Sequence, residues 1–223
     1  MKVAVSWSGG MESNLALYKT QKEGHDIKYL VAFVTETWPS FCHPVTIMEL
    51  QSKSLGIPLI KLIVKQPYDQ GYRDAIKKLV DMGMEGIVTG DIYVVDDYHG
   101  PWMEKATRGQ NIELIMPLWE QDTTKVLDEE ISSGFKSVFT CLIKKCFTEE
   151  WLGRELNKTS VNDLKKLAKE TNMDPCGENG EYHTMVINGP NYKQPIEITK
   201  ITKEQTDTRL YIKINKYALK PSK

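Results

Sequence analysis

The fold is decided by the first thirteen residues, in which Val3-Ala4-Val5-Ser6-Trp7 is followed by Ser8-Gly9-Gly10-Met11-Glu12-Ser13. The apolar, β-branched run predicts a buried strand, and residues Glu12 to Lys22 predict a helix. Between them, two glycines allow a tight turn with outward N–H groups at the positive end of that helix. With the hydroxyls of Ser8 and Ser13, such a loop is typical of a phosphate cradle, although a glycine turn with a serine N-cap is the simpler alternative.

The same alternation of apolar runs and amphipathic helices continues to about residue 117. We predict further strands at 29–35, 58–64, 86–90 and 113–116, with helices at 46–55 and 69–82. Apolar strands separated by helices are typical of βαβ units, so the predicted fold class is α/β, a Rossmann-like parallel sheet with helices on both faces. Ligands bind such a sheet at the carboxyl ends of its strands.

The pattern changes after about residue 123. We predict a helix at 124–133, a strand at 137–142, a polar helical stretch to 169, and short antiparallel strands at 185–188, 196–201 and 210–214. The chain is thus expected to divide into a larger α/β domain, 1–122, and a smaller C-terminal α+β domain, 123–223. The lysine-bearing end, 216–223, is expected to be a solvated tail.

Composition excludes several classes of protein. There are 29 Lys and Arg against 30 Asp and Glu, a balance that argues against coating nucleic acid or a membrane surface. Four cysteines, none in C-x-x-C spacing, predict free thiols in a reducing compartment: Cys42, Cys141, Cys146 and Cys176. No window approaches the roughly 18 apolar residues of a membrane span, and no signal peptide is recognised. We expect a cytoplasmic protein without membrane or direct nucleic-acid partners.

A second polar cluster lies far from the first, in the octet GENGEYHT at 177–184. Two glycines imply a tight, exposed turn, and polar groups gathered on such a turn suit ligand or metal binding. The plainer alternative is a polar turn that enters a strand. The candidate residues of this octet are Glu178, Asn179, Gly180, Glu181, His183 and Thr184.

Neither a Walker A loop nor a G-x-G-x-x-G fingerprint is present. The Ser-Gly-Gly-x-x-Ser loop resembles the PP-loop of the N-type ATP pyrophosphatases. The octet resembles the GEGGEFET-type signature of the diphthine–ammonia ligase family, which is a branch of the PP-loop enzymes. Other matching pieces follow in the family's order between about Val3 and Asn191: Phe41-Cys42-His43, Val88 to Ile92 (VTGDI), Met116 to Trp119 (MPLW), Gly134 to Lys136 (GFK) and Trp151 to Leu156 (WLGREL).

This resemblance implies a two-domain enzyme that completes diphthamide on elongation factor 2. ATP would adenylate the carboxylate of diphthine, pyrophosphate would leave, and ammonia, supplied as ammonium, would displace AMP to form the amide. The chemistry is sensible because a carboxylate is a poor acyl donor until its oxygen becomes a leaving group. Magnesium is expected to neutralise the triphosphate.

The resemblance also implies roles for individual residues. The nucleotide-binding residues would be Ser8, Gly9, Gly10, Ser13 and Gly90. Asp91 would hold magnesium or substrate, with a capping role as the alternative, and His43 would orient the carboxylate or be an ordinary loop histidine. Glu178 and Glu181 would accept the ammonium or position the trimethylammonium group of diphthine. Substrate contacts would come from Asn179, Gly180, His183 and Thr184.

The sequence departs from the family pattern in the loop and in the octet. Met11 and Glu12 stand where PP-loop members often carry Lys and Asp, and His183 stands where Glu is usual. Met11 removes a cation from the phosphates, so magnesium, Arg108 or Arg154 would have to supply the charge.

Two other functions stay open. One is a PP-loop enzyme that adenylates a different acceptor, either a small molecule or tRNA, although paired cysteines and a basic RNA-binding module are both missing. The other is a nucleotide-binding sensor without chemistry, which would give no reason for the octet. The sequence also leaves the oligomeric state open, a homo-oligomer included.

Overall fold

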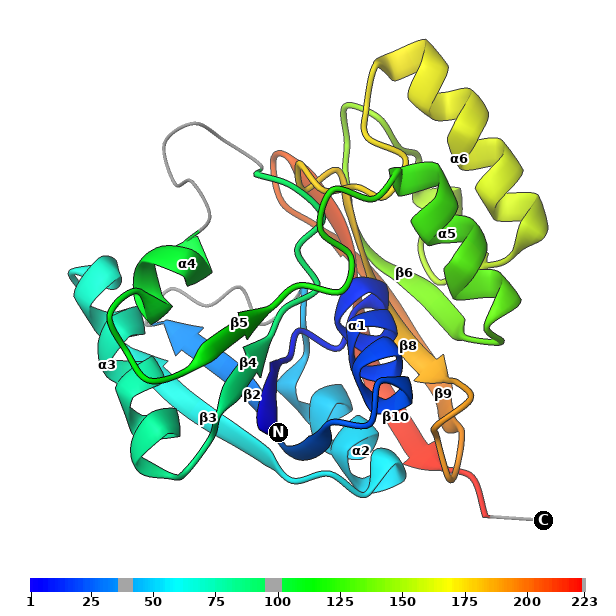
Figure 1. Cartoon of the computed structure of the whole chain (residues 1–223). Coiled ribbons are helices and arrows are strands. Elements are labelled where there is room, and N and C mark those ends of the chain that lie inside the picture. The colour runs from blue at the N-terminus through cyan, green and yellow to red at the C-terminus, as the bar shows by residue number, and fades with distance from the viewer. Residues whose placement is uncertain (36–41, 95–101, 222–223) are drawn as a thin grey trace. The chain divides into compact units, whose positions relative to one another are not determined.

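The structure, a computed structural model, describes residues 1–35, 42–94 and 102–221 (Figure 1). The described residues form two compact units: the first falls within 1–8, 12–38 and 57–120, and the second within 9–11, 39–56 and 121–223. The chain therefore enters the second unit at Gly9 and returns to the first at Glu12. Phe41, which contributes to the family resemblance, lies outside the described residues.

The first unit is built on a five-stranded parallel sheet, as the sequence predicts. Its strands are β1 (Lys2–Ser6), β2 (Asp26–Thr35), β3 (Leu59–Val64), β4 (Gly86–Val88) and β5 (Glu113–Ile115). They lie in the order β3-β2-β1-β4-β5, and all four pairings are parallel. The strand order reverses between β1 and β4, and this is the point where α/β sheets bind ligands.

Helices cover both faces of this sheet (Figure 1). α3 (Tyr68–Asp81) and α4 (Trp102–Thr107) pack on one face, and α1 (Met11–Lys22) lies on the other. The two faces are used because each β–α–β crossover is right-handed. The chain first moves from β1 through β2 to β3 and then in the opposite direction, to β4 and β5, so the later helices lie on the other face. The six-residue α4 was not predicted, because so short a helix shows no periodicity. The face under α3 and α4 forms a cluster of Ala4, Val31, Phe33, Val64, Ala75, Ile76, Leu79, Met84, Ile87, Met103 and Ala106.

The second unit is built on an antiparallel sheet, again as predicted. Along one edge of β6 (Lys136–Ile143) lies β8 (Tyr182–Asn188), and along its other edge lie β7 (Glu155–Leu156) and β10 (Arg209–Leu219). The last strand, β9 (Ile196–Gln205), pairs with β10. Its helices are α2 (Val45–Leu55), α5 (Thr123–Ser132), α6 (Lys158–Thr171) and the single 3-10 turn η1 (Glu149–Trp151).

One expectation about the end of the chain is wrong. Residues Lys216 to Leu219 belong to β10 and pair with β9, where Lys216 lies opposite Lys200 and Leu219 opposite Ile196. Alternating Tyr217 and Leu219 give this end a partly buried side, so it extends the sheet instead of forming a solvated tail.

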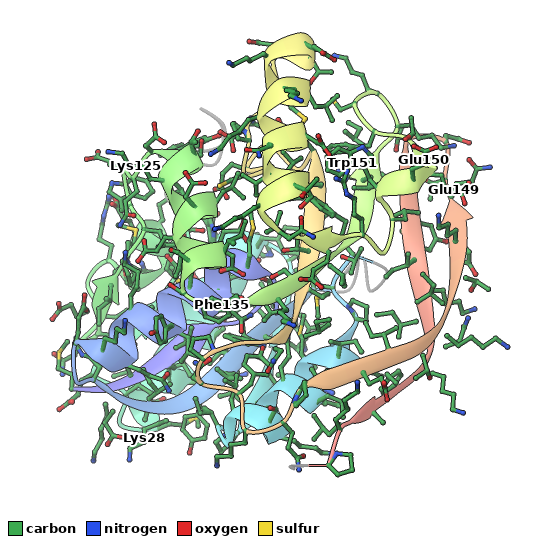
Figure 2. All side chains as sticks on the ribbon, turned by 90° about the vertical axis from the view of Figure 1, so that its right-hand side faces the viewer. Lys28, Lys125, Phe135, Glu149, Glu150 and Trp151 are labelled. Atoms are coloured by element: carbon green, nitrogen blue, oxygen red, sulfur yellow. The ribbon has the colours of Figure 1, made fainter. Side chains whose placement is uncertain are left out.

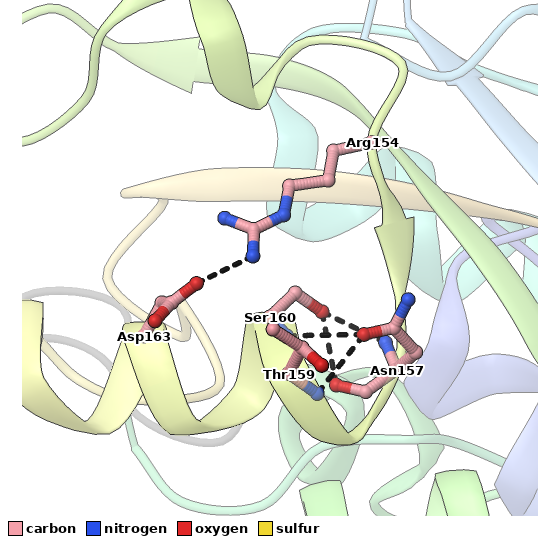
Figure 3. A network of polar contacts seen from close by, with 5 residues as sticks. All are labelled: Arg154, Asn157, Thr159, Ser160 and Asp163. Atoms are coloured by element: carbon pink, nitrogen blue, oxygen red, sulfur yellow. Dashed lines mark hydrogen bonds and ion pairs between the residues drawn. The ribbon is translucent and has the colours of Figure 1, made fainter.

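The start of α6 is fixed by a network of polar contacts (Figure 3). Asn157 Oδ1 accepts hydrogen bonds from two N–H groups of the first turn, and Ser160 Oγ accepts one from the Asn157 N–H in return. This reciprocal arrangement is a capping box. Arg154 forms an ion pair with Asp163 one turn into the helix and lies over the ring of Trp151. Arg154 is therefore engaged in this network.

The end of α5 and the turn that leads to β6 bury both an aromatic ring and a carboxyl group. Phe135, labelled in Figure 2, is only 5% exposed and fills the space beside Gly189 so fully that no Cβ would fit there. Just before it, Glu130 is 1% exposed and accepts a hydrogen bond from Ser137 Oγ at 2.9 Å. Burial raises the pKa of Glu130 to about 8, although the bond from Ser137 opposes the rise.

In the described part of the chain, no helix is both long and apolar enough to cross a membrane.

The raised pKa of Glu130 predicts how stability depends on pH. A carboxyl group whose pKa is higher in the folded protein stabilises the fold at low pH and loses that contribution as pH rises through the folded value. Glu130→Gln keeps an acceptor for Ser137 and removes the titration. We expect its free energy of unfolding, measured by urea denaturation, to exceed that of the wild type above about pH 8 and to change less with pH. The exposed Glu170→Gln is the matched control, and an unchanged pH slope in Glu130→Gln would contradict the assignment.

Candidate functional site

The carboxyl ends of β1 and β4 bring together several of the predicted residues. Ser8 follows β1, and its hydroxyl donates to Ser13 Oγ at 3.3 Å. Gly90 follows β4 and packs against the first turn of α1, where a Cβ at position 90 would lie 2.7 Å from the carbonyl carbon of Glu12. Only glycine allows this approach. The switch point of the sheet therefore carries Ser8, Ser13, Gly90 and the adjoining Asp91.

Asp91 has the properties of a carboxylate that a cation would stabilise. Burial raises its pKa, and the nearby Thr89 hydroxyl only partly opposes the rise. No group of three or more His, Cys, Asp or Glu side chains among the described residues could hold a metal ion by itself. Magnesium, however, commonly takes one or two carboxylates and completes its shell with phosphate oxygens and water. Asp91 fits that kind of site.

The carbonyl of Gly9 is held by two elements of the second unit. It accepts a hydrogen bond from the Val186 N–H of β8 at 3.0 Å and another from Gln51 Nε2 of α2 at 2.9 Å. Gln51 is fully buried, and its Nε2 also donates to the Val186 carbonyl at 2.8 Å. The Gly9–Gly10 peptide is trans, so its C=O and N–H point in opposite directions. Fixing the Gly9 carbonyl therefore fixes the direction of the Gly10 N–H.

Position 9 requires glycine for two independent reasons. Its φ of +79° lies in the left-handed region, which is unfavourable for residues with a Cβ. A Cβ would also lie 2.5 Å from Gln51 Oε1 and 2.8 Å from Met185 Cε. The first glycine of the loop thus gives α2 and β8 room to approach the backbone.

The octet is bound to the same loop. Thr184 Oγ1 accepts a hydrogen bond from the Met11 N–H at 3.2 Å, and so satisfies one of the N–H groups at the start of α1. Thr184 and Val186 are two residues apart on β8, and they bind Met11 and Gly9 respectively. The two motifs that appear separate in the sequence are therefore neighbours in the structure.

Within the octet the two glutamates have different surroundings. Glu181 is buried, and its Oε1 accepts hydrogen bonds from the Asp174 N–H at 3.0 Å and from Asn179 Nδ2 at 3.3 Å. It therefore braces the turn from inside. Glu178 is partly exposed and Asn179 is exposed, so these two side chains are accessible to a ligand.

Two predicted histidines lie against each other. The ring centroids of His43 and His183 are 4.7 Å apart, with the ring planes at 73°. The pKa of His183 falls to about 3, first because its ring is desolvated and then because His43 and Arg209 would repel a second positive charge. His183 is therefore neutral at physiological pH, in the position where the family usually has glutamate.

A pair of thiols and an arginine complete this cluster, and sequence reasoning missed the arginine. Cys42 donates to Cys141 with their sulfurs 3.0 Å apart, and Cys141 pairs with His183 across β6 and β8. Arg209 Nη1 donates to the Gly180 carbonyl at 2.9 Å. Arg209 follows a polar turn and belongs to no motif, so nothing in the sequence marks it.

Arg108, the other arginine considered for the phosphates, lies at the wrong edge of the sheet. It is exposed and follows the end of α4, and β5 begins a few residues later. The N–H of Glu113, the first residue of β5, donates to the Glu85 carbonyl, which precedes β4. These are the amino ends of the strands, whereas Ser8 and Gly90 lie at the carboxyl ends.

Two models of known protein families match the chain. The model of the diphthamide synthase N-terminal domain matches residues 1–113, and that of the diphthamide synthase C-terminal domain matches residues 122–219. The chain belongs to the diphthamide synthase family. The family to which the loop and the octet point in the sequence is thereby confirmed.

Curated relatives of this diphthamide synthase family member are named diphthine–ammonia ligase. The protein of Schizosaccharomyces pombe is 26% identical over 133 residues, which cover 59% of this chain and only 22% of that protein. The mouse protein is 24% identical over 226 residues, covering 89% of this chain and 83% of its own length, and the human protein is 23% identical with 88% and 82% covered. The chain thus spans about a fifth of the fission yeast protein and most of the two mammalian ones.

Among solved structures, a crystal structure of a predicted subunit of tRNA methyltransferase from Methanocaldococcus jannaschii matches with a TM-score of 0.46 and 18% identity. The match covers 85% of this chain and 98% of that one.

Gly9→Ala tests the loop geometry. The added Cβ cannot fit beside Gln51 and Met185, so we expect the affinity for Mg–ATP, measured by calorimetry, to fall at least about tenfold. Gly134→Ala is the matched control, because Gly134 also has a positive φ (+87°) but has nothing within 4 Å of a Cβ. Equal ATP affinity in the two variants would show that the close packing at position 9 is irrelevant.

The low pKa of His183 gives a second prediction. In the folded protein we expect the His183 C2 proton to show no titration by NMR between about pH 8 and about pH 5, with His183→Gln used to assign its signal. Because the unfolded chain takes up a proton near its ordinary pKa, His183 also makes the fold less stable as pH falls below about 6.5. A titration midpoint near the ordinary value would contradict the burial of this ring.

Proposed function

We propose that this protein is a diphthine–ammonia ligase, which uses ATP to amidate the carboxylate of diphthine on elongation factor 2. The observation that carries the proposal is the contact of the octet with the glycine loop, through Thr184 and Met11 and through Val186 and Gly9. It supports a single reaction centre, with a nucleotide on the loop beside an acceptor on the octet. The names of the mammalian relatives, which match along most of their length, support the same reaction.

In this proposal the nucleotide lies on the first β–α turn. Backbone N–H groups of Gly9 and Gly10, the hydroxyls of Ser8 and Ser13, and the positive end of α1 would hold the phosphates. Gly90 keeps the end of β4 close to that turn. Asp91 would hold magnesium, which would neutralise the triphosphate as pyrophosphate leaves.

The acceptor would lie on the octet. A carboxylate oxygen attacks the α-phosphorus and pyrophosphate leaves; ammonia then attacks the acyl carbon, and AMP leaves as the amide forms. A neutral His183 would contact the acceptor by hydrogen bonds without repelling its trimethylammonium group, and His43 would help to orient the carboxylate. The accessible Glu178 and Asn179 are suited to the ammonium ion and its released proton, whereas Glu181, with Gly180 and Thr184, shapes the turn.

These assignments give each of the two predicted domains a part in the proposed reaction. The residues of 1–122 would supply the ATP site and His43, and those of 123–223 would supply the rest of the acceptor site. An acceptor that serves protein synthesis places the reaction in the cytoplasm.

The proposal is tested by product analysis. The protein is mixed with ATP, magnesium, ammonium and elongation factor 2 that carries diphthine, and nucleotides and the modified histidine are followed by mass spectrometry. We expect AMP and pyrophosphate in equal amounts with the amide, and none of the three with a factor that lacks diphthine. AMP formed without amidation would indicate another acceptor, and ATP bound without any AMP would indicate a nucleotide sensor; either result would overturn the proposal.

A further inference from the structure

Arg209 is the first residue of β10, the strand that pairs with β9. Three lysines on these strands or just after them form ion pairs: Lys203 with Glu149, Lys213 with Glu204, and Lys220 with Glu197. Arg209 is half-buried, yet no described carboxylate lies within ion-pair distance of its guanidinium. Its guanidinium instead donates a hydrogen bond to a backbone carbonyl.

The surroundings of this guanidinium are polar. One nitrogen, Nη1, donates to the Gly180 carbonyl, and the other, Nη2, lies beside Gly180, 3.5 Å from where a Cβ would be. The hydrogen bond from Cys42 and then the charge of Arg209 lower the pKa of the Cys141 thiol, and the same charge helps to lower the pKa of His183. A partly desolvated cation without a carboxylate partner attracts an anion, and the planar guanidinium matches a carboxylate best.

We propose that Arg209 binds the carboxylate of the acceptor, beside Gly180 and the two histidines. This inference rests on the proposed function and names the residue that recognises the reacting group. The guanidinium would attract the carboxylate end of the acceptor and repel its trimethylammonium end, and so set the direction in which the acceptor lies. Conversion to the amide removes the negative charge, which weakens this contact and favours release of the product.

Two substitutions separate the effect of the Arg209 charge from the effect of its hydrogen bond to the Gly180 carbonyl. Arg209→Gln keeps an N–H donor for the Gly180 carbonyl but removes the charge, whereas Arg209→Lys keeps the charge but loses the planar fork. Binding of elongation factor 2 in its acid form (diphthine) and its amide form (diphthamide) is measured by calorimetry for the wild type and both variants. Mg–ATP affinity is measured alongside, because a disturbed octet would alter the glycine loop through Thr184.

We expect the wild type to prefer the acid form. Arg209→Gln should weaken binding of the acid form about tenfold or more, leave the amide form and ATP within about twofold, and so abolish the preference. Arg209→Lys should lie between the two. An Arg209→Gln variant that keeps the preference, or that loses both forms or ATP equally, would overturn the proposal and leave Arg209 as a brace only.

The same experiment distinguishes the two proposals. A wild type that amidates the factor while Arg209→Gln keeps its acid preference overturns only the role of Arg209. A wild type that neither binds nor amidates the factor overturns the proposed function, and the role of Arg209 falls with it.

Discussion

The hydrogen bonds that hold the Gly9 carbonyl are the constraint on which the candidate site depends. Val186 of β8 and Gln51 of α2 both donate to this single oxygen. Loss of the buried Gln51 donor would remove its hydrogen bonds to the Gly9 and Val186 carbonyls, each of which contributes about 0.5–1.5 kcal/mol. Because the peptide is planar, the same bonds direct the following N–H. These bonds thus fix the backbone of the loop at Gly9 and Gly10.

Much of the fold can be predicted from the sequence because its signals are local. The parallel sheet follows from apolar runs such as Leu30 to Val34 between amphipathic helices, and the antiparallel strands of the second unit follow from short β-branched runs. The contacts of the glycine loop with α2 and β8 could not be predicted. They depend on hydrogen bonds between residues 42 to 173 positions apart, such as Gln51 to Gly9 and Met11 to Thr184, and no local pattern encodes such pairings. The end of β10 was not predicted as a strand because its lysines make the segment polar overall, although Tyr217 and Leu219 form a partly buried side.

Charge was the hardest property of the site to predict. Met11 leaves the loop without a lysine, and the two arginines that the sequence suggested lie elsewhere: Arg154 pairs with Asp163, and Arg108 lies at the amino ends of the strands. The cation beside the octet is Arg209, which is brought there by the pairing of β10 with β6. The roles of Ser8, Asp91, Glu178 and the other candidate residues remain predictions, whereas their positions follow from the structure.

The central claim is that the Ser-Gly-Gly loop binds the phosphates of ATP, and NMR of protein labelled with ¹⁵N-glycine tests it most directly. The chain has 15 glycines, so the amide spectrum is simple to resolve and assign. On titration with Mg–ATP, the account predicts large shifts for Gly9 and Gly10, a smaller one for Gly90, and none for Gly134 or Gly153. Unmoved Gly9 and Gly10 signals at saturating ATP, with shifts elsewhere, would contradict it.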